Sequence, residues 1–372
     1  MQSAGGDGRE LETDTLAKRV INESLQITKN DNVQLYCSKH TIDLAESLAV
    51  ECQKVGARAS IALYTDKILY DFYLDRPVEY VETPDPFGLA TLDVATVSIG
   101  LSELEDPAKM ETVTPERWTA LSKGDEPYRE KLLKSRHQGA SIHLGYVTPQ
   151  RAKVYGYDYK AWRDNSYAAV DIDYGEMQKL GAKLKAALGK AKEIRITNAA
   201  GADLSARIEG AQIKVDDGVL NRKGSEATSR EVELPGGSMT VVPDLANVKG
   251  AFVSDIPLPA FAKLVKGISW KFEKGMITSF EGGENIEALK NPWLKATGDK
   301  NKFGYIRFGL NPNAKPGFLF NDIVRGAVTV GIGENRWFGG LNESSITLTT
   351  TSVAATVKLD KKVIIDKGKM VL

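Results

Sequence analysis

The stretch Asn32–Tyr64, NVQLYCSKHTIDLAESLAVECQKVGARASIALY, decides the fold of the first half of the chain. Its apolar run at 32–37 has the length of a buried strand. Thr41 is a suitable N-cap, and the helix that it begins ends near Gly56, a residue type common at helix C-termini. A second apolar strand follows at 58–64. This strand–helix–strand order favours a parallel sheet that is covered by helices on both faces.

The same alternation continues outward from this unit. Apolar residues recur at helical spacing over 16–25, which predicts a helix before the first strand. The segments 92–99 and 141–147 are further strand candidates, and 174–188 has the pattern of an amphipathic helix. The first half therefore reads as a doubly wound α/β arrangement.

The second half has a different pattern, with short strands and most of the turn-forming Gly-Gly, Asn-Pro and Pro-Gly pairs. Two segments read as hairpins, 270–280 with its turn at Lys274-Gly275 and 357–365 with its turn near Asp360-Lys361. Other strands are expected at 192–197, 203–208, 304–310, 326–333 and 344–351. This half is predicted to be β-rich.

These patterns predict an α/β protein with two domains. We expect a disordered tail at 1–12, an N-terminal doubly wound α/β domain at 13–190 and a β-rich C-terminal domain at 191–372. A chain of 372 residues is long for one domain and ordinary for two.

The charge balance excludes some classes of partner. Lys plus Arg and Asp plus Glu both number 49, so the formal net charge is zero. Proteins that bind nucleic acid or an anionic membrane usually carry an excess of basic residues, so neither partner is expected. No run of 18 apolar residues is present, and the first ten residues lack the apolar core of a signal peptide. We expect a cytoplasmic protein.

The few cysteines and histidines limit the chemistry. Cys37 and His40 lie three residues apart at a strand end and could form a nucleophile and its base. The alternative is a loop histidine beside a buried strand cysteine, and no third orienting group favours catalysis. His137 and His143 flank a strand candidate, but a metal would need further ligands, so packing roles are the simpler interpretation.

A hydroxyl-rich segment lies near the C-terminus. On a strand, Ser345, Thr347, Thr349 and Thr351 would point to the same side. Threonine is a favoured strand residue, which accounts for most of this pattern. The functional alternative is a pocket wall lined by hydroxyl groups. The glycine-rich turns around 331–340 match neither a dinucleotide fingerprint nor a P-loop.

The second half nevertheless resembles a known family. NAAGADLSARIEG, ELPGGSMTVVP, FGLNPNA and GAVTVGIGENRWFGGLN follow, in order, motifs of the thermophilic metallo-aminopeptidases of the aminopeptidase T and aminopeptidase S type. These segments begin at Asn198, Glu233, Phe308 and Gly326. The resemblance implies the aminopeptidase T fold, a homodimer and a groove at the domain junction that holds two metal ions in the family.

The resemblance also shows where the chain departs from the family. The positions that correspond to metal-binding carboxylates and histidines are now occupied by Ser238, Tyr305, Thr329, Thr347 and Thr349, with Arg307 as an alternative to Tyr305. A related branch, the ring-cleaving dihydroxypyridine dioxygenases, keeps iron on a subset of these positions, which are changed here too. Hydroxyl groups are poor ligands beside imidazole and carboxylate. We therefore expect no metal and no other cofactor.

Our leading hypothesis is a metal-free, aminopeptidase-like pseudoenzyme in a peptide-modifying pathway. Its degenerate groove, with Arg307 and Trp337 near the changed positions, would bind a peptide or a small carboxylate-bearing ligand. One alternative is an enzyme with metal-independent chemistry in the same groove. Another is a metallo-aminopeptidase that uses other carboxylates. The candidates for that role are Glu284, Glu334 and Glu343.

Overall fold

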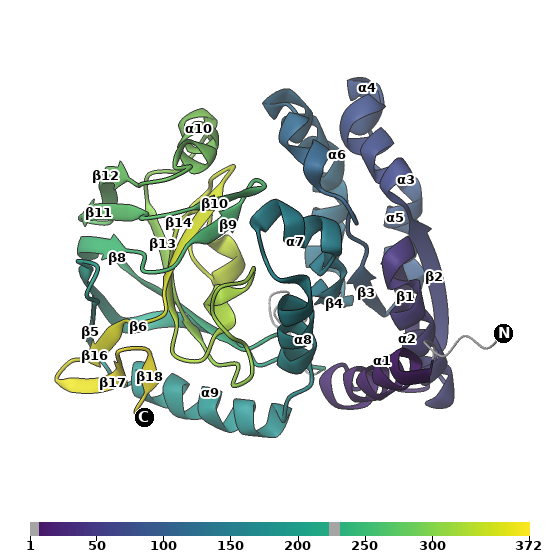
Figure 1. Ribbon diagram of the computed structural model, residues 1–372, viewed down its shortest axis with the longest axis horizontal. Helices are drawn as coiled ribbons and strands as arrows, with labels where there is room; N and C mark the ends of the chain where they lie inside the picture. Colours follow the sequence, from purple (N-terminus) through teal and green to yellow (C-terminus); the bar gives the residue numbers. More distant parts are fainter. Residues whose placement is uncertain (1–6, 223–230) are drawn as a thin grey trace. The chain divides into compact units, whose positions relative to one another are not determined.

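The computed structural model describes residues 7–222 and 231–372 (Figure 1). These residues form two compact units. Unit 1 runs to Asp171 and also includes Gly218–Pro235, and unit 2 comprises Ile172–Asp217 and Gly236–Leu372. Of the tail expected at 1–12, residues 1–6 lie outside the described part, and the helix Asp7–Arg19 begins within it.

Unit 1 is built on a five-stranded sheet of order β2-β1-β3-β4-β7 in which every neighbouring pair is parallel. This confirms the doubly wound α/β prediction. The strands are β1 (Asn32–Ser38), β2 (Arg58–Tyr64), β3 (Val97–Leu101), β4 (Gln138–Ile142) and β7 (Glu231–Leu234).

The helices of unit 1 connect these strands. They are α1 (Asp7–Arg19), α2 (Ile42–Lys54), α3 (Asp66–Tyr70), α4 (Val78–Val81), α5 (Pro86–Val94), α6 (Pro115–Lys134), α7 (Pro149–Tyr155) and α8 (Tyr159–Val170). Shorter turns of helix are η1 (Val20–Ser24), η2 (Lys39–Thr41), η3 (Asp71–Asp75), η4 (Ala108–Thr112) and η5 (His143–Tyr146).

Two strand predictions in this unit were wrong at their boundaries. The segment 92–99 begins inside α5, because Asp85 caps that helix by accepting bonds from two backbone amides, and the strand begins only at Val97. The segment 141–147 is mostly the turn η5, and β4 lies earlier in the sequence. Hydrophobic runs alone do not separate a strand from the turn that follows it.

The segment Gly218–Pro235 returns to unit 1 after unit 2 has begun. Arg222 pairs there with the buried carboxylate of Asp31 and donates a hydrogen bond to Gln138. Ser24 donates a hydrogen bond to the carbonyl of Gly218. These contacts hold residues 218 and 222 in unit 1, and β7 pairs with β4, although the two strands are far apart in the sequence.

Unit 2 contains an antiparallel sheet with eleven described strands, and it agrees with the expected β-rich half. The strands are β5 (Glu193–Thr197), β6 (Asp203–Asp216), β8 (Ser238–Val253), β11 (Ser269–Glu273), β12 (Met276–Glu281), β13 (Phe303–Gly309), β14 (Val328–Gly333), β15 (Thr347–Ser352), β16 (Thr356–Leu359), β17 (Lys362–Asp366) and β18 (Lys369–Met370). A separate pair consists of β9 (Leu258–Ala260) and β10 (Lys263–Val265).

Both hairpins predicted in this half are confirmed. The pair β11–β12 turns at Lys274-Gly275 and the pair β16–β17 turns at Asp360-Lys361. Lys274, Gly275 and Asp360 have positive φ angles, as tight turns between twisted strands require.

The helix α9 (Tyr174–Leu188) is confirmed where the sequence predicts it, but it belongs to unit 2. Its Gly181 lies against the side chains of Val215 and Leu310. The compact units therefore divide before this helix rather than near residue 190. The other helical segments of unit 2 are α10 (Glu287–Lys295), η7 (Asn321–Ile323) and η8 (Arg336–Phe338). No helix in the described parts of the chain is long and apolar enough to cross a membrane.

Candidate functional site

The strand register of unit 2 gathers most of the predicted site residues on one side of the sheet. Thr240 of β8, Arg307 of β13 and Thr329 of β14 are direct neighbours, and Thr351 of β15 completes this row. Paired residues of antiparallel strands point to the same face, and so do residues two apart on one strand. We call this side the hydroxyl face. It consists of Ser238, Thr240, Tyr305, Arg307, Thr329, Thr347, Thr349 and Thr351.

Arg307 is a cation at the centre of this face. Its Nε donates to the Thr240 hydroxyl at 3.1 Å, and a terminal nitrogen lies 2.6 Å from the carboxylate of Asp322 on η7. The guanidinium carbon lies 5.5 Å from the centroid of the Tyr305 ring and 5.1 Å from that of Phe338. The Arg307 and Asp322 side chains are 15% and 25% exposed, so the ion pair is largely shielded from water.

The centre of the face is closely packed. The hydroxyls of Thr329 and Thr351 lie 2.8 Å apart, and both residues are buried. The Tyr305 ring lies over Gly331, where an added Cβ would approach ring atoms to 2.5 Å. Phe338 packs edge-on against Tyr305 at 4.5 Å between centroids. These side chains contact and hydrogen-bond one another, so the centre of the face is an ordered, closely packed arrangement.

The remaining predicted residues lie toward the margin. Trp337 of η8 is 37% exposed, and the Lys214 ammonium lies 5.4 Å from its ring centroid. Thr347 is exposed and donates to the carbonyl of Glu334. Thr349 is half-buried, and Ser238 is buried at the start of β8.

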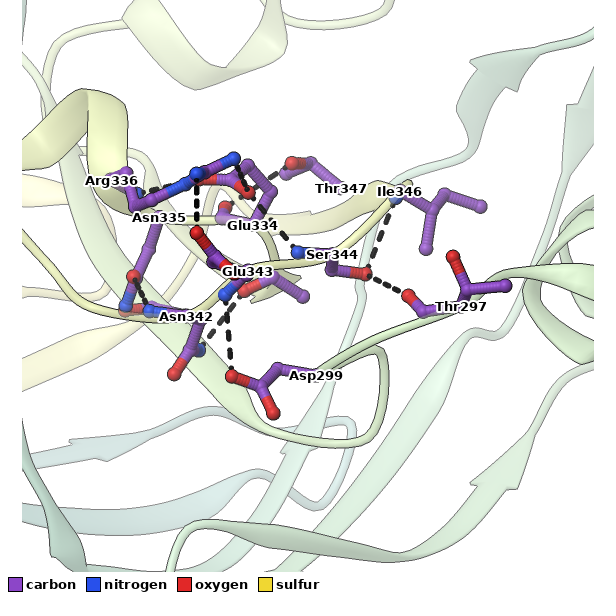
Figure 2. Close-up of polar contacts among 12 residues, drawn as sticks. Thr297, Asp299, Glu334, Asn335, Arg336, Asn342, Glu343, Ser344, Ile346 and Thr347 are labelled. Carbon is purple, nitrogen blue, oxygen red and sulfur yellow. Dashed lines mark hydrogen bonds and ion pairs between the residues drawn. The ribbon is translucent and has the colours of Figure 1, made fainter. Parts of the chain in front are cut away.

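A polar network holds the loop that carries Trp337 and Phe338. Figure 2 shows Arg336 between the carboxylates of Glu334 and Glu343, with the shortest contacts at 2.9 Å and 2.8 Å. The buried amide of Asn342 donates to the carbonyls of Phe303 and Gly333. The loop is thereby fixed to the ends of β13 and β14.

The alternative carboxylate ligands are already engaged. Burial raises the pKa of Glu334, but hydrogen bonds from Arg336 and from two backbone amides outweigh it and leave the pKa below its ordinary value. Glu343 pairs with Arg336, and Glu284 pairs with Lys266 at 2.7 Å. Across residues 7–222 and 231–372, no group of three or more His, Cys, Asp or Glu side chains could hold a metal ion.

The donor chemistry of the hydroxyl face does not fit a catalytic metal. Zinc and iron sites in proteins are built from imidazole, carboxylate or thiolate groups. Here the side chains of the face are mostly neutral hydroxyls, the nearby Asp322 carboxylate is already paired with Arg307, and Arg307 places a permanent positive charge among them. A divalent cation about 5 Å from a guanidinium would be repelled by roughly 6–7 kcal/mol at an effective dielectric constant near 20.

The histidines lie in unit 1. His137 is buried, and both of its ring nitrogens have partners 2.9 Å away, the Ala95 carbonyl and the Ser98 hydroxyl. His143 lies in η5, 4.0 Å from Glu233. No hydrogen bond joins Cys37 to His40 in the described structure, and burial raises the pKa of the Cys37 thiol. A thiolate–imidazole pair is therefore not formed.

Sequence reasoning missed Asp322, Thr240, Lys214 and Phe338 as parts of this arrangement. Side chains alternate between the two faces of a strand, so Lys214 of β6 and Thr240 of β8 could be assigned to the hydroxyl face only if the register of these strands with β13 were known. Asp322 had no local signal, because it reaches Arg307 from a short turn.

Comparisons with known proteins bear on the fold and the family. The structure is similar to wild-type AmpT from Thermus thermophilus, with a TM-score of 0.78 and 16% identity over 98% of this chain and 100% of that one. It is also similar to 2,5-dihydroxypyridine dioxygenase from Pseudomonas putida KT2440, with a TM-score of 0.62 and 16% identity over 97% of each chain. At this identity the two structures establish the fold alone, which is that expected from the aminopeptidase T resemblance.

No curated protein sequence matches the chain. One family model, described as NicX: 2,5-dihydroxypyridine 5,6-dioxygenase, matches residues 176–372, which include every residue of the hydroxyl face. Because this match spans more than half of the chain, the chain belongs to the 2,5-dihydroxypyridine 5,6-dioxygenase (NicX) family.

Proposed function

We propose that the chain binds a small carboxylate-bearing ligand at the hydroxyl face, without a resident metal ion. The observation that carries this proposal is the position of Arg307, whose guanidinium lies among threonine hydroxyls and aromatic rings. A guanidinium stays charged at all physiological pH values and can bind a carboxylate through two parallel hydrogen bonds.

The surroundings of Arg307 suit a small ligand. Asp322 already supplies a carboxylate 2.6 Å from the guanidinium, and a ligand carboxylate would take its place or share the cation. The rings of Tyr305 and Phe338 provide aromatic surface beside the guanidinium. The rest of the ligand would therefore pack on aromatic faces, toward the exposed Trp337.

Isothermal titration calorimetry with acetate, benzoate and the dipeptide Ala-Ala would test this proposal. We expect saturable binding of at least one probe, weakened at least tenfold by Arg307→Gln and partly retained by Arg307→Lys. Arg195→Gln is the matched control, because Arg195 also pairs with an aspartate, Asp203, on the same sheet but on exposed strands. Equal weakening by both variants, or no binding of any probe, would contradict the proposal.

The family description gives the competing outcome. The metal content of the purified protein should stay well below one ion per chain after incubation with iron(II), zinc or cobalt. Stoichiometric iron together with oxygen consumption on 2,5-dihydroxypyridine would replace the proposal with a dioxygenase. Release of amino acids from peptides would replace it with an aminopeptidase. We further propose a cytoplasmic homodimer, which cell fractionation and analytical ultracentrifugation would test.

A further inference from the structure

A second group of polar residues lies at the carboxyl ends of the parallel strands of unit 1. From β1 the chain connects to β2 on one side, whereas β3 lies on the other side, so the strand order reverses between β1 and β3. Open parallel sheets bind ligands in the space beyond the strand ends at such a point. We call this region the carboxyl edge. It consists of Ser38, His40, Glu103, Tyr146, Gln150 and Arg151.

Hydrogen bonds and close contacts join these residues across the ends of three strands. Ser38, at the end of β1, accepts a hydrogen bond from the Glu103 amide at 2.8 Å, and its hydroxyl donates to the Glu103 carbonyl at 2.6 Å. His40 donates through Nε2 to the Gly145 carbonyl at 2.8 Å. The backbone of Gly145 in turn lies close to Glu103, whose side chain is 3.3 Å from the Cβ position of Gly145.

The beginning of α7 completes the group. The Tyr146 hydroxyl is hydrogen-bonded to the Glu103 carboxyl, and the Arg151 guanidinium carbon lies 4.6 Å from the centroid of the Tyr146 ring. Arg151 also donates to the Leu104 carbonyl at 2.9 Å. The loops after β1, β3 and β4 therefore meet at one place.

Three buried polar atoms of the carboxyl edge have no hydrogen-bond partner in the described structure. They are Nδ1 of His40, Oε1 of Gln150 and Nε of Arg151. Arg151 is only 7% exposed, and it forms no direct ion pair with a carboxylate of the described residues. Unpaired buried polar groups are costly and rare in native proteins, so three of them on adjacent loops indicate a missing partner.

The hydrogen bond of His40 indicates what this partner must offer. A carbonyl oxygen only accepts, so Nε2 carries the hydrogen, and in the neutral ring Nδ1 is a bare acceptor. Oε1 of Gln150 is also an acceptor, whereas Nε of Arg151 is a cationic donor. The complementary group combines an oxyanion, for Arg151, with a hydroxyl that donates to His40 or Gln150.

We propose that the carboxyl edge of unit 1 is a second binding site, which takes a small oxyanion that carries a hydroxyl group, such as a hydroxy acid or a hydroxylated phosphate ester. His40, Glu103, Tyr146 and Gln150 are half-buried, so part of each residue lies at the surface, although the three unpaired atoms themselves are buried. Burial raises the pKa of Glu103, although the Tyr146 hydrogen bond and Arg151 oppose it. A carboxyl group that retains its proton more readily repels an incoming anion less.

Nuclear magnetic resonance of the full chain labelled with ¹⁵N-arginine and ¹⁵N-histidine tests this site directly. The probes are glycolate and glycerol 3-phosphate, with acetate and sulfate as anions that lack a carbon-borne hydroxyl group. We expect saturable shifts of the Arg151 Nε–H signal and of the His40 Nδ1 signal with the hydroxylated probes, at least tenfold tighter than with acetate or sulfate. The hydroxy acid and the phosphate ester are compared in separate titrations, which distinguishes the two sources of the oxyanion.

The same sample contains its own controls. Arg117 of α6 donates through Nε to the Tyr73 carbonyl at 2.6 Å, and both ring nitrogens of His137 are bonded, so their signals should stay unchanged. Arg151→Lys and His40→Gln should each weaken binding at least tenfold, while Arg195→Gln, at an exposed arginine paired with Asp203, should leave it unchanged. Shifts shared by Arg117, equal binding of acetate, or no saturable shift would overturn the proposal, whatever happens at the hydroxyl face.

Discussion

The hydroxyl face of unit 2 and the carboxyl edge of unit 1 contain similar residues, but these residues differ in how completely they are paired. Each has an arginine above a tyrosine ring, with Arg307 5.5 Å from Tyr305 and Arg151 4.6 Å from Tyr146. Arg307 has a carboxylate 2.6 Å away, whereas Arg151 has none within 4.0 Å among the described residues. Arg307 forms a direct ion pair within the protein, whereas Arg151 has no direct ion pair and an unpaired Nε, although it interacts electrostatically with Glu103.

The two candidate sites were found by different arguments. The family resemblance points to the hydroxyl face, whose polar groups are largely paired with one another. The topology of the parallel sheet points to the carboxyl edge, whose polar groups are incompletely paired. Folding alone favours full pairing, so the incompletely paired region carries the stronger indication of an external partner.

The largest expected effect on stability comes from breaking the ion pair between Arg307 and Asp322. Arg307→Met leaves Asp322 half-buried without its partner and should lower the free energy of unfolding by about 2–4 kcal/mol. Urea denaturation followed by circular dichroism measures this loss. The double variant Arg307→Met with Asp322→Leu should recover much of it, because neither charge then remains. A loss below about 1 kcal/mol in the single variant would mean that the pair is not a structural element.

A second change tests the packing of the hydroxyl face. Gly331→Ala places a Cβ 2.5 Å from the Tyr305 ring and should cost about 1–3 kcal/mol, because the ring must leave its position. Gly100→Ala in β3 is the matched control, since its nearest neighbour would be 3.7 Å away. Thermal denaturation of both variants measures the difference. Equal melting temperatures would show that Tyr305 moves freely and that the face is not closely packed.

Local patterns were enough to predict most of this packing surface. The alternation of Thr347, Thr349 and Thr351 correctly placed these side chains on one face, and their register partners are Gly333, Gly331 and Thr329. Ser345 precedes the strand and so does not share the alternation. The turns at 274–275 and 360–361 were also predictable, because Gly275 and Asp360 are residue types that tolerate the positive φ angles found there.

Long-range pairings could not be predicted from the sequence in the same way. Asp322 approaches Arg307 from a turn, and β7 joins the unit 1 sheet only after the chain has already formed part of unit 2. The carboxyl edge depends on Gln150 and Arg151, which read as ordinary polar residues at a helix start. Their candidate role in binding can be recognised only from the strand order, which brings three loops together.

A smaller effect is expected when the unpaired cation is removed. Arg151→Met should change the free energy of unfolding by less than about 1 kcal/mol or stabilise the protein slightly, because burying a cation without a direct carboxylate partner already costs stability, and only its longer-range attraction to Glu103 offsets this. The lost bond to the Leu104 carbonyl limits the gain. Urea denaturation beside Arg307→Met gives the comparison. A loss as large as that of Arg307→Met would mean that Arg151 supports the fold rather than a ligand.

The smallest effect is a difference in pH dependence between the two regions. Burial raises the pKa of Glu103, so the folded state binds its proton more tightly than the unfolded state does, and this contribution to stability falls as pH rises from the ordinary glutamate pKa through the raised one. Glu334, beside the hydroxyl face, has a lowered pKa despite its burial, because Arg336 and backbone amides hold its charged form. Its contribution is present above the ordinary glutamate pKa and is lost as pH falls through the lowered one.

Unfolding free energies measured from pH 3 to 8 should therefore show that Glu103→Gln gains stability relative to the wild type toward high pH, whereas Glu334→Gln gains stability relative to the wild type toward low pH. If both variants changed with the same sign, the two carboxyl groups would share one environment, and the contrast between a paired face and an unpaired edge would fail.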